Sequence, residues 1–173
     1  MPFVPITGPI LSDTVYRMMG GQNKLAAKDL AVTLPPVEFV TVEINSGGTV
    51  EIPVPQLINP MDATFAKRGV DDELALLVSP DPMDIEVRWV HLVTDPTNGS
   101  TRNVGCKAFL HCLPKGIPEI SLTPGEASEN EITYSVTSYR LVVDGEEKWA
   151  IDKFANVLRV DGVDYFEDIQ WML

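Results

Sequence analysis

Residues 131–164 read EITYSVTSYRLVVDGEEKWAIDKFANVLRVDGVD. Two Asp-Gly pairs, Asp144-Gly145 and Asp161-Gly162, divide runs of apolar and β-branched residues. An Asp-Gly pair accepts the positive φ values that a two-residue type I′ hairpin turn requires. The stretch therefore predicts an antiparallel meander with strands at 131–137, 139–143 and 147–160.

The composition is that of one globular domain, 1–173, with an acidic surface. The chain is 45% hydrophobic and 22% charged, and its formal net charge is −12. So acidic a surface repels phosphate backbones and anionic membranes, which disfavours nucleic-acid recognition through a basic patch. No apolar run approaches the ~20 residues of a membrane helix, and the first residues lack the basic n-region of a signal peptide. We expect a protein made in the cytosol.

Proline and glycine interrupt the first part of the chain. Residues 1–30 contain Pro2, Pro5, Pro9 and Gly20-Gly21, and predict an N-terminal arm with at most one short strand or helix. A strand after Pro35-Pro36 has apolar residues on alternate faces, and such a face switch indicates a bulge or a sheet edge.

A second arm is predicted at 45–60. It turns at Asn45-Ser46-Gly47-Gly48 and returns through Val50 and Ile52. Pro53 and Pro55 keep the return strand out of a central sheet position. We expect this segment to project from the domain.

One flanking helix is expected at about 71–79. Asp71-Asp72-Glu73 places acidic residues where a helix N-terminus favours them, and Pro80 and Pro82 end the helix. Further strands are expected at 62–69, from residue 84 onward and across 103–112, followed by a surface loop at 114–130. The Asp164-x-x-Glu167 spacing predicts a short helix in the last ten residues. The whole pattern is mainly β, an antiparallel sandwich or barrel.

Four residues of metal-ligating type fall close together in sequence: His91, Cys106, His111 and Cys112. The two cysteines are six positions apart on one strand face, roughly 20 Å along a strand, which is too far for a disulfide. His111 points to the opposite face, and the spacing is not that of a zinc site. We interpret them as two small buried residues and two ordinary histidines.

No catalytic motif is present. Carboxylates occur in turns, at the expected helix start and in the 126–131 loop, where solvated charge is the simpler interpretation. Gly-x-Ser-x-Gly, phosphate-loop and calcium-loop spacings are absent. The sequence predicts neither an enzyme nor a metal or cofactor site.

The order of several short pieces resembles the major tail tube proteins of contractile-tail phages. The resemblance runs from about Val32 to the C-terminus and is strongest over 131–164. Its pieces are Thr33-Leu34-Pro35, the Gly47-Gly48 arm, Tyr139-Arg140-Leu141 with Asp144-Gly145, Asp152 and Asn156, and Val160-Asp161-Gly162-Val163-Asp164.

The resemblance implies a β-sandwich with a flanking helix, and subunits that close into hexameric rings and stack into a hollow tube. The implied partners are further copies of the chain, the tail sheath, the tape measure, the baseplate or spike and the tube terminator. Genomic DNA would pass through unbound, or the tube would serve as the needle of a tailocin. The implied location is the inner tube of the virion tail, assembled in the host cytoplasm.

Two sets of residues follow as candidates for assembly. The ring-stacking arm comprises Asn45, Ser46, Gly47, Gly48, Val50 and Ile52. The turns of the meander comprise Asp144, Gly145, Asp161 and Gly162. Two alternatives stay open: a type VI secretion-like tube protein, and a monomeric acidic β-sandwich that binds a ligand or acts on a glycan.

Overall fold

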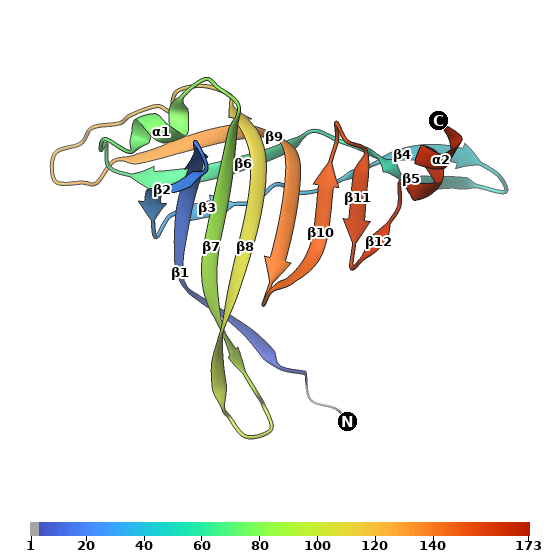
Figure 1. Ribbon diagram of the computed structural model, residues 1–173, viewed down its shortest axis with the longest axis horizontal. Coiled ribbons are helices and arrows are strands. Elements are labelled where there is room, and N and C mark those ends of the chain that lie inside the picture. Colours follow the sequence, from blue (N-terminus) through green and yellow to red (C-terminus); the bar gives the residue numbers. More distant parts are fainter. Residues whose placement is uncertain (1–3) are drawn as a thin grey trace.

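The computed structural model describes residues 4–173. The described chain is mainly β, with 61% strand and 6% helix, which confirms the expected fold class. Figure 1 shows an elongated molecule dominated by one large antiparallel sheet, in the order β12-β11-β10-β9-β8-β7-β1-β2. Its strands are β1 Ile6–Met19, β2 Gln22–Lys28, β7 Met83–Thr94, β8 Thr101–Pro114, β9 Glu129–Val143, β10 Glu146–Asp152, β11 Val157–Val160 and β12 Val163–Asp164.

Strand β9 belongs to two layers, because its two halves have different partners along one edge. Its C-terminal half pairs with β10, whereas its N-terminal half pairs with β6 (Met61–Arg68). Strand β6 pairs in turn with β3 (Ala31–Thr33). The register of β9 against β8 shifts at Thr137, between Val136 and Ser138. An extra residue there bends the strand, and the bend coincides with the change of partner.

The expected break between 137 and 139 is therefore wrong: β9 is continuous and carries a bulge. The expected strand at 147–160 is instead two strands, β10 and β11. Between them Asp152 Oδ1 accepts hydrogen bonds from the backbone amides of Phe154 and Ala155. Asn156 then takes a φ of 52°. Asp and Asn favour such a turn, because an Asp carboxylate bonds to the backbone two residues on and Asn tolerates a positive φ.

The N-terminal part of the chain is more regular than predicted. Strands β1 and β2 form a hairpin, and β1 also pairs with β7 along most of its length. The turn is Gly20-Gly21, with φ values of 57° and 82°, in a two-residue connection between Met19 and Gln22. Residues 6–28 are therefore part of the main sheet and not an irregular arm; residues 1–3 lie outside the described chain.

Both helices are short. Helix α1 (Leu74–Val78) is shorter than the expected 71–79, and Asp71 Oδ1 accepts a hydrogen bond from the Leu74 amide just before it. Helix α2 (Glu167–Met172) occupies the expected place near the end of the chain, where Asp164 Oδ1 accepts from the Phe166 amide. Between β8 and β9 the chain at 115–128 is a largely exposed loop, shorter than the expected 114–130, because Pro114 belongs to β8 and Glu129 and Asn130 belong to β9.

The core lies between the large sheet and the layer of β6 and β3. Phe65 and Tyr134 contribute rings 5.1 Å apart from one side, and Val15, Ile85 and Val87 face them from β1 and β7. Because every second residue of β8 points inward, Cys106, Ala108, Leu110 and Cys112 are all at most 2% exposed.

Candidate functional site

The arm predicted at 45–60 is a hairpin with its own two-stranded sheet, β4 (Phe39–Asn45) and β5 (Thr49–Ile58). In Figure 1 it extends beyond α2 at one end of the molecule. The register shift between Phe39 and Val40 is the bulge that the sequence indicated. The projection is therefore present, but it spans 39–58. Asn45-Ser46-Gly47-Gly48 forms only its tip, where the Ser46 amide bonds to the Gly48 carbonyl oxygen at 3.0 Å.

The two faces of the arm differ in chemistry. Val42 lies opposite Ile52, and Ile44 lies opposite Val50. Directly opposed residues of an antiparallel pair share a face, so these four form an apolar face, and they are 43–50% exposed. Glu43 opposes Glu51 on the other face. Val42 and Ile44 were not among the predicted stacking residues, although the alternation of the outgoing strand contained the signal.

The two Asp-Gly pairs both form two-residue turns. Asp144 and Gly145 have φ values of 51° and 81°, and Asp161 and Gly162 have 50° and 83°. They join Val143 to Glu146 and Val160 to Val163. In an antiparallel meander, alternate turns lie at the same end of the strands. Figure 1 shows the β9–β10 and β11–β12 turns at the lower end of the sheet.

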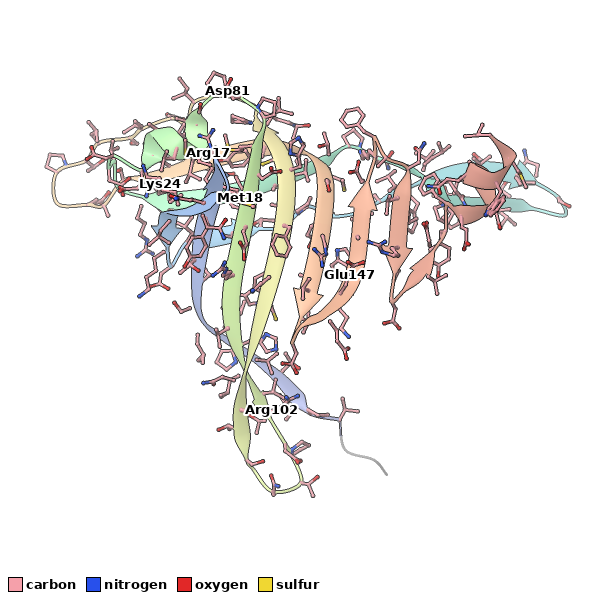
Figure 2. All side chains as sticks on the ribbon, in the orientation of Figure 1. Arg17, Met18, Lys24, Asp81, Arg102 and Glu147 are labelled. Atoms are coloured by element: carbon pink, nitrogen blue, oxygen red, sulfur yellow. The ribbon has the colours of Figure 1, made fainter. Side chains whose placement is uncertain are left out.

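A network of charged and aromatic side chains covers the exposed face of the large sheet. Glu147 on β10 accepts hydrogen bonds of 2.8 Å from Arg140 Nε and from Arg159 Nε, and Figure 2 shows its side chain between β10 and β11. Burial raises the pKa of the Glu147 carboxyl, but the bonds from Arg159 and Arg140 outweigh that effect and hold the pKa below its ordinary value. The network continues where Arg140 stacks over the Phe109 ring at 5.3 Å.

Further along the same face, Glu86 is only 3% exposed. It pairs with Arg88 and accepts a hydrogen bond from Asn23 at 3.0 Å, while Arg88 lies over the Tyr16 ring. Strands β1 and β2 lie beside Glu86 because β1 pairs with both β2 and β7. On this face Arg88, Arg140 and Arg159 each pair with a carboxylate of the same subunit.

The metal-type residues do not converge. Cys106 Sγ lies 3.3 Å from His91 Nδ1, and His111 Nδ1 lies 2.7 Å from Asp84 Oδ1 on the opposite face. Burial raises the pKa of the Cys112 thiol to about 12. Within residues 4–173 no three His, Cys, Asp or Glu side chains are placed to hold a metal ion. Nor does any helix of that part of the chain have the length and apolar character to cross a membrane.

The sheet ends in open edges. Strands β2 and β12 stand at the two ends of the strand order, and in the described chain each is paired along one edge only. An unpaired edge presents free backbone donors and acceptors to other chains. The candidate surfaces are therefore two sheet edges, an apolar hairpin face and a set of turns, all suited to contact between proteins.

Three solved structures are similar to this chain. The sheath/tube terminator of an extracellular contractile injection system, PVC, in its extended state matches with a TM-score of 0.50 and 15% identity over 78% of this chain and 94% of that one. The PVC sheath–tube complex in its extended state has a TM-score of 0.49 and 15% identity, over 78% of this chain and 89% of that one. The tube-terminating cap of the anti-feeding prophage has a TM-score of 0.47 and 14% identity, over 82% of this chain and 95% of that one. At these identities the first match supports the fold alone.

No curated protein matches the chain. The family model of phage tail tube protein FII, in contrast, matches residues 18–173, nearly the whole sequence. The chain therefore belongs to the phage tail tube protein FII family, whose members are structural proteins and not enzymes.

Proposed function

We propose that this chain is the repeating subunit of the inner tube of a phage-type contractile tail. Six copies close into a ring, rings stack into a hollow tube, and the tube conducts DNA or forms the needle of a tailocin. The observation that carries the proposal is the family match over residues 18–173 in a chain whose main strand order ends in two open edges, β2 and β12.

Ring closure gives a use to the two open edges. A β protein with unpaired edges tends to aggregate unless those edges are covered. Head-to-tail contacts that close around an axis cover one edge of each subunit with the other edge of its neighbour. In this arrangement the meander with Asp144-Gly145 and Asp161-Gly162 stands near one contact, and its turns hold the edge in shape.

Stacking gives a use to the arm. The apolar face formed by Val42, Ile44, Val50 and Ile52 is 43–50% exposed in the described chain. Burying apolar surface contributes about 25 cal/mol per Å², so a neighbouring ring that covers this face gains stability. The arm of each subunit then contacts the next ring in the tube.

The acidic balance suits a conduit for DNA. Six copies carry 6 × −12 = −72 formal charges per ring, so phosphates find few favourable contacts and little friction. Ion pairs such as those of Glu147 with Arg140 and Arg159 bind these cations within the subunit, so that they are less available to phosphates. Screening by salt limits the repulsion between subunits.

The partners proposed for the tube are the sheath around it, the tape measure within it, the baseplate or spike at one end and a terminator at the other. Its proposed location is the virion tail, after assembly in the cytoplasm of the bacterial host.

Negative-stain electron microscopy of the purified protein, alone and co-expressed with a tail initiator, tests the proposal. We expect stacked rings with sixfold end views. Dispersed monomers under every ionic condition, with or without the initiator, would contradict it and favour a monomeric acidic β-sandwich. A type VI secretion-like tube would also form rings; neighbouring genes for a sheath and a tape measure would separate that case.

A further inference from the structure

An apolar groove lies at the end of the molecule that carries β2 and β3. It encloses about 490 Å³ between strands β1 and β7 on one side and the segment 30–34 on the other. Its apolar lining includes Ile10, Leu30, Val32, Leu34 and Trp89. Asp13 also lines the groove, but its carboxylate already accepts a hydrogen bond of 2.8 Å from the Leu30 amide. The groove therefore suits apolar side chains.

The opposite end of the molecule carries side chains of that kind. Trp171, Met172 and Leu173 at the end of α2 are 85%, 84% and 96% exposed. Isolated exposed apolar residues are ordinary, but a contiguous group of large ones marks a contact surface. Within the described chain none of the three belongs to, or packs against, the hydrophobic core.

Two short segments at the two ends carry opposite charges, although Asp71 and Glu73 lie with Lys28 around a neighbouring pocket. Strand β2 contains Lys24 and Lys28 and no acidic residue, whereas residues 161–173 contain four acidic residues and no basic one. Asp29, next to Lys28, accepts a hydrogen bond from Ser12 Oγ at 2.7 Å. Complementary charge of this kind steers two surfaces together and fixes their register.

The two ends lie far apart along the long axis. Figure 1 places β2 and β3 at one end and β12 with α2 at the other, and Figure 2 shows Lys24 at the β2 end. The α2 end therefore lies away from the groove of its own subunit. A head-to-tail contact joins unlike surfaces of two identical chains, as ring closure requires.

We propose that the α2 end of one subunit docks on the β2–β3 end of the next subunit in the same ring. Trp171, Met172 and Leu173 enter the groove, and Glu167 and Asp168 face Lys24 and Lys28. This inference rests on the proposed tube assembly and specifies which surfaces of neighbouring subunits meet.

A charge exchange tests the polar part of the contact. The double reversal Lys24→Glu with Lys28→Glu, and separately Glu167→Lys with Asp168→Lys, each place like charges across the contact. We expect either pair to raise the protein concentration needed for assembly at least about tenfold at low salt. A chain with all four reversals should assemble at close to the wild-type concentration. If the combined chain shows no recovery, the pairing is wrong.

Cross-linking tests the apolar part. The native Cys106 and Cys112 are buried, so a chain with Trp171→Cys and Val32→Cys presents two new reactive thiols. On oxidation of assembled tubes we expect a ladder of covalent oligomers ending at the closed ring. The control pairs Val32→Cys with Phe154→Cys, since Phe154 is 84% exposed and outside the proposed contact; it should give no ladder.

The outcomes separate the two proposals. Tubes from both cysteine chains with no ladder from the Trp171–Val32 pair would overturn the docking inference and leave the tube function standing. A ladder that extends beyond one ring would place the contact between rings and also overturn the inference. A wild-type chain that never assembles would overturn both. Urea unfolding of each variant shows whether its fold is intact.

Discussion

Tyr134 on β9 donates the hydrogen bond of its hydroxyl to the backbone carbonyl oxygen of Leu77 in α1. The Tyr134 side chain is completely buried, and burial raises the pKa of its hydroxyl, which therefore remains a donor. Arg17 Nη1 donates to the neighbouring Leu76 carbonyl oxygen at 2.7 Å. These two bonds attach the short helix to the strand that both layers share and to β1.

Replacing Tyr134 with Phe should lower the free energy of unfolding by about 1–3 kcal/mol, because the Leu77 carbonyl oxygen stays buried without a donor. Urea unfolding of dispersed protein measures the change. Tyr165→Phe is the matched control: Tyr165 is 47% exposed, so we expect a change within about 0.5 kcal/mol. Equal effects from both substitutions would show that the Leu77 contact is not responsible.

Gly162→Ala tests the second Asp-Gly turn. Gly162 has a φ of 83°, and an added Cβ would meet no atom within 4 Å, so the cost is conformational and should be about 1 kcal/mol. Gly105→Ala is the control, since it also has free space around it but no positive φ.

We expect the joint replacement of Asp161 and Gly162 to impair ring formation in electron micrographs. Normal tubes from that chain would show that the turn is not needed for assembly.

Glu147 should make the fold sensitive to acid. The pKa of its carboxyl is lower in the folded chain than the ordinary 4.5, so its stabilising effect is complete above that value and is lost as the pH falls through the folded pKa. Glu147→Gln should therefore lower the urea midpoint at neutral pH and reduce the further loss between about pH 5 and pH 3.

The control for this experiment is Glu146→Gln. Glu146 is one residue away, with a side chain 78% exposed and a single ion pair to Lys148, and exposed pairs contribute little. A pH profile for Glu147→Gln that parallels the wild type would argue against a role for the Arg140–Glu147–Arg159 cluster.

The arm can be tested face by face. Ile44→Ser with Ile52→Ser should leave the free energy of unfolding within about 0.5 kcal/mol of wild type, because both side chains are already more than 40% exposed. It should nevertheless shift assembly from tubes to single rings in electron micrographs. Glu43→Ser with Glu51→Ser changes the opposite face and should keep the tubes. If the isoleucine variant stacks normally, the apolar face is not the contact between rings.

The sequence was most informative where local chemistry determines structure. The Asp-Gly turns, the alternation of residues 103–112 and the short helix after Asp164 depend on residues within a few positions of one another, and all three are present. Gly20-Gly21 carried an equally strong hairpin signal. The prolines on its N-terminal side favoured an irregular arm instead.

Features that depend on distant residues could not be predicted. The pairing of β1 with β7 joins residues about 70 positions apart, such as Val15 and Val87. The burial of Glu86 follows from that pairing, because Asn23 and Tyr16 reach it only when β1 and β2 are in place. The groove has the same origin, since Ile10, Val32 and Trp89 come from three separate segments.

The opposition of Glu43 and Glu51 in the arm has a kinetic consequence. A hairpin of two strands alone is marginally stable, and like charges facing each other weaken it further. We therefore expect the arm of a free subunit to become fully ordered only when it docks on a ring, at an entropic cost. The first ring then forms slowly, and growth on an existing ring is fast. Purified subunits should show a lag phase that a preformed ring abolishes, so that polymerisation starts where a template is supplied.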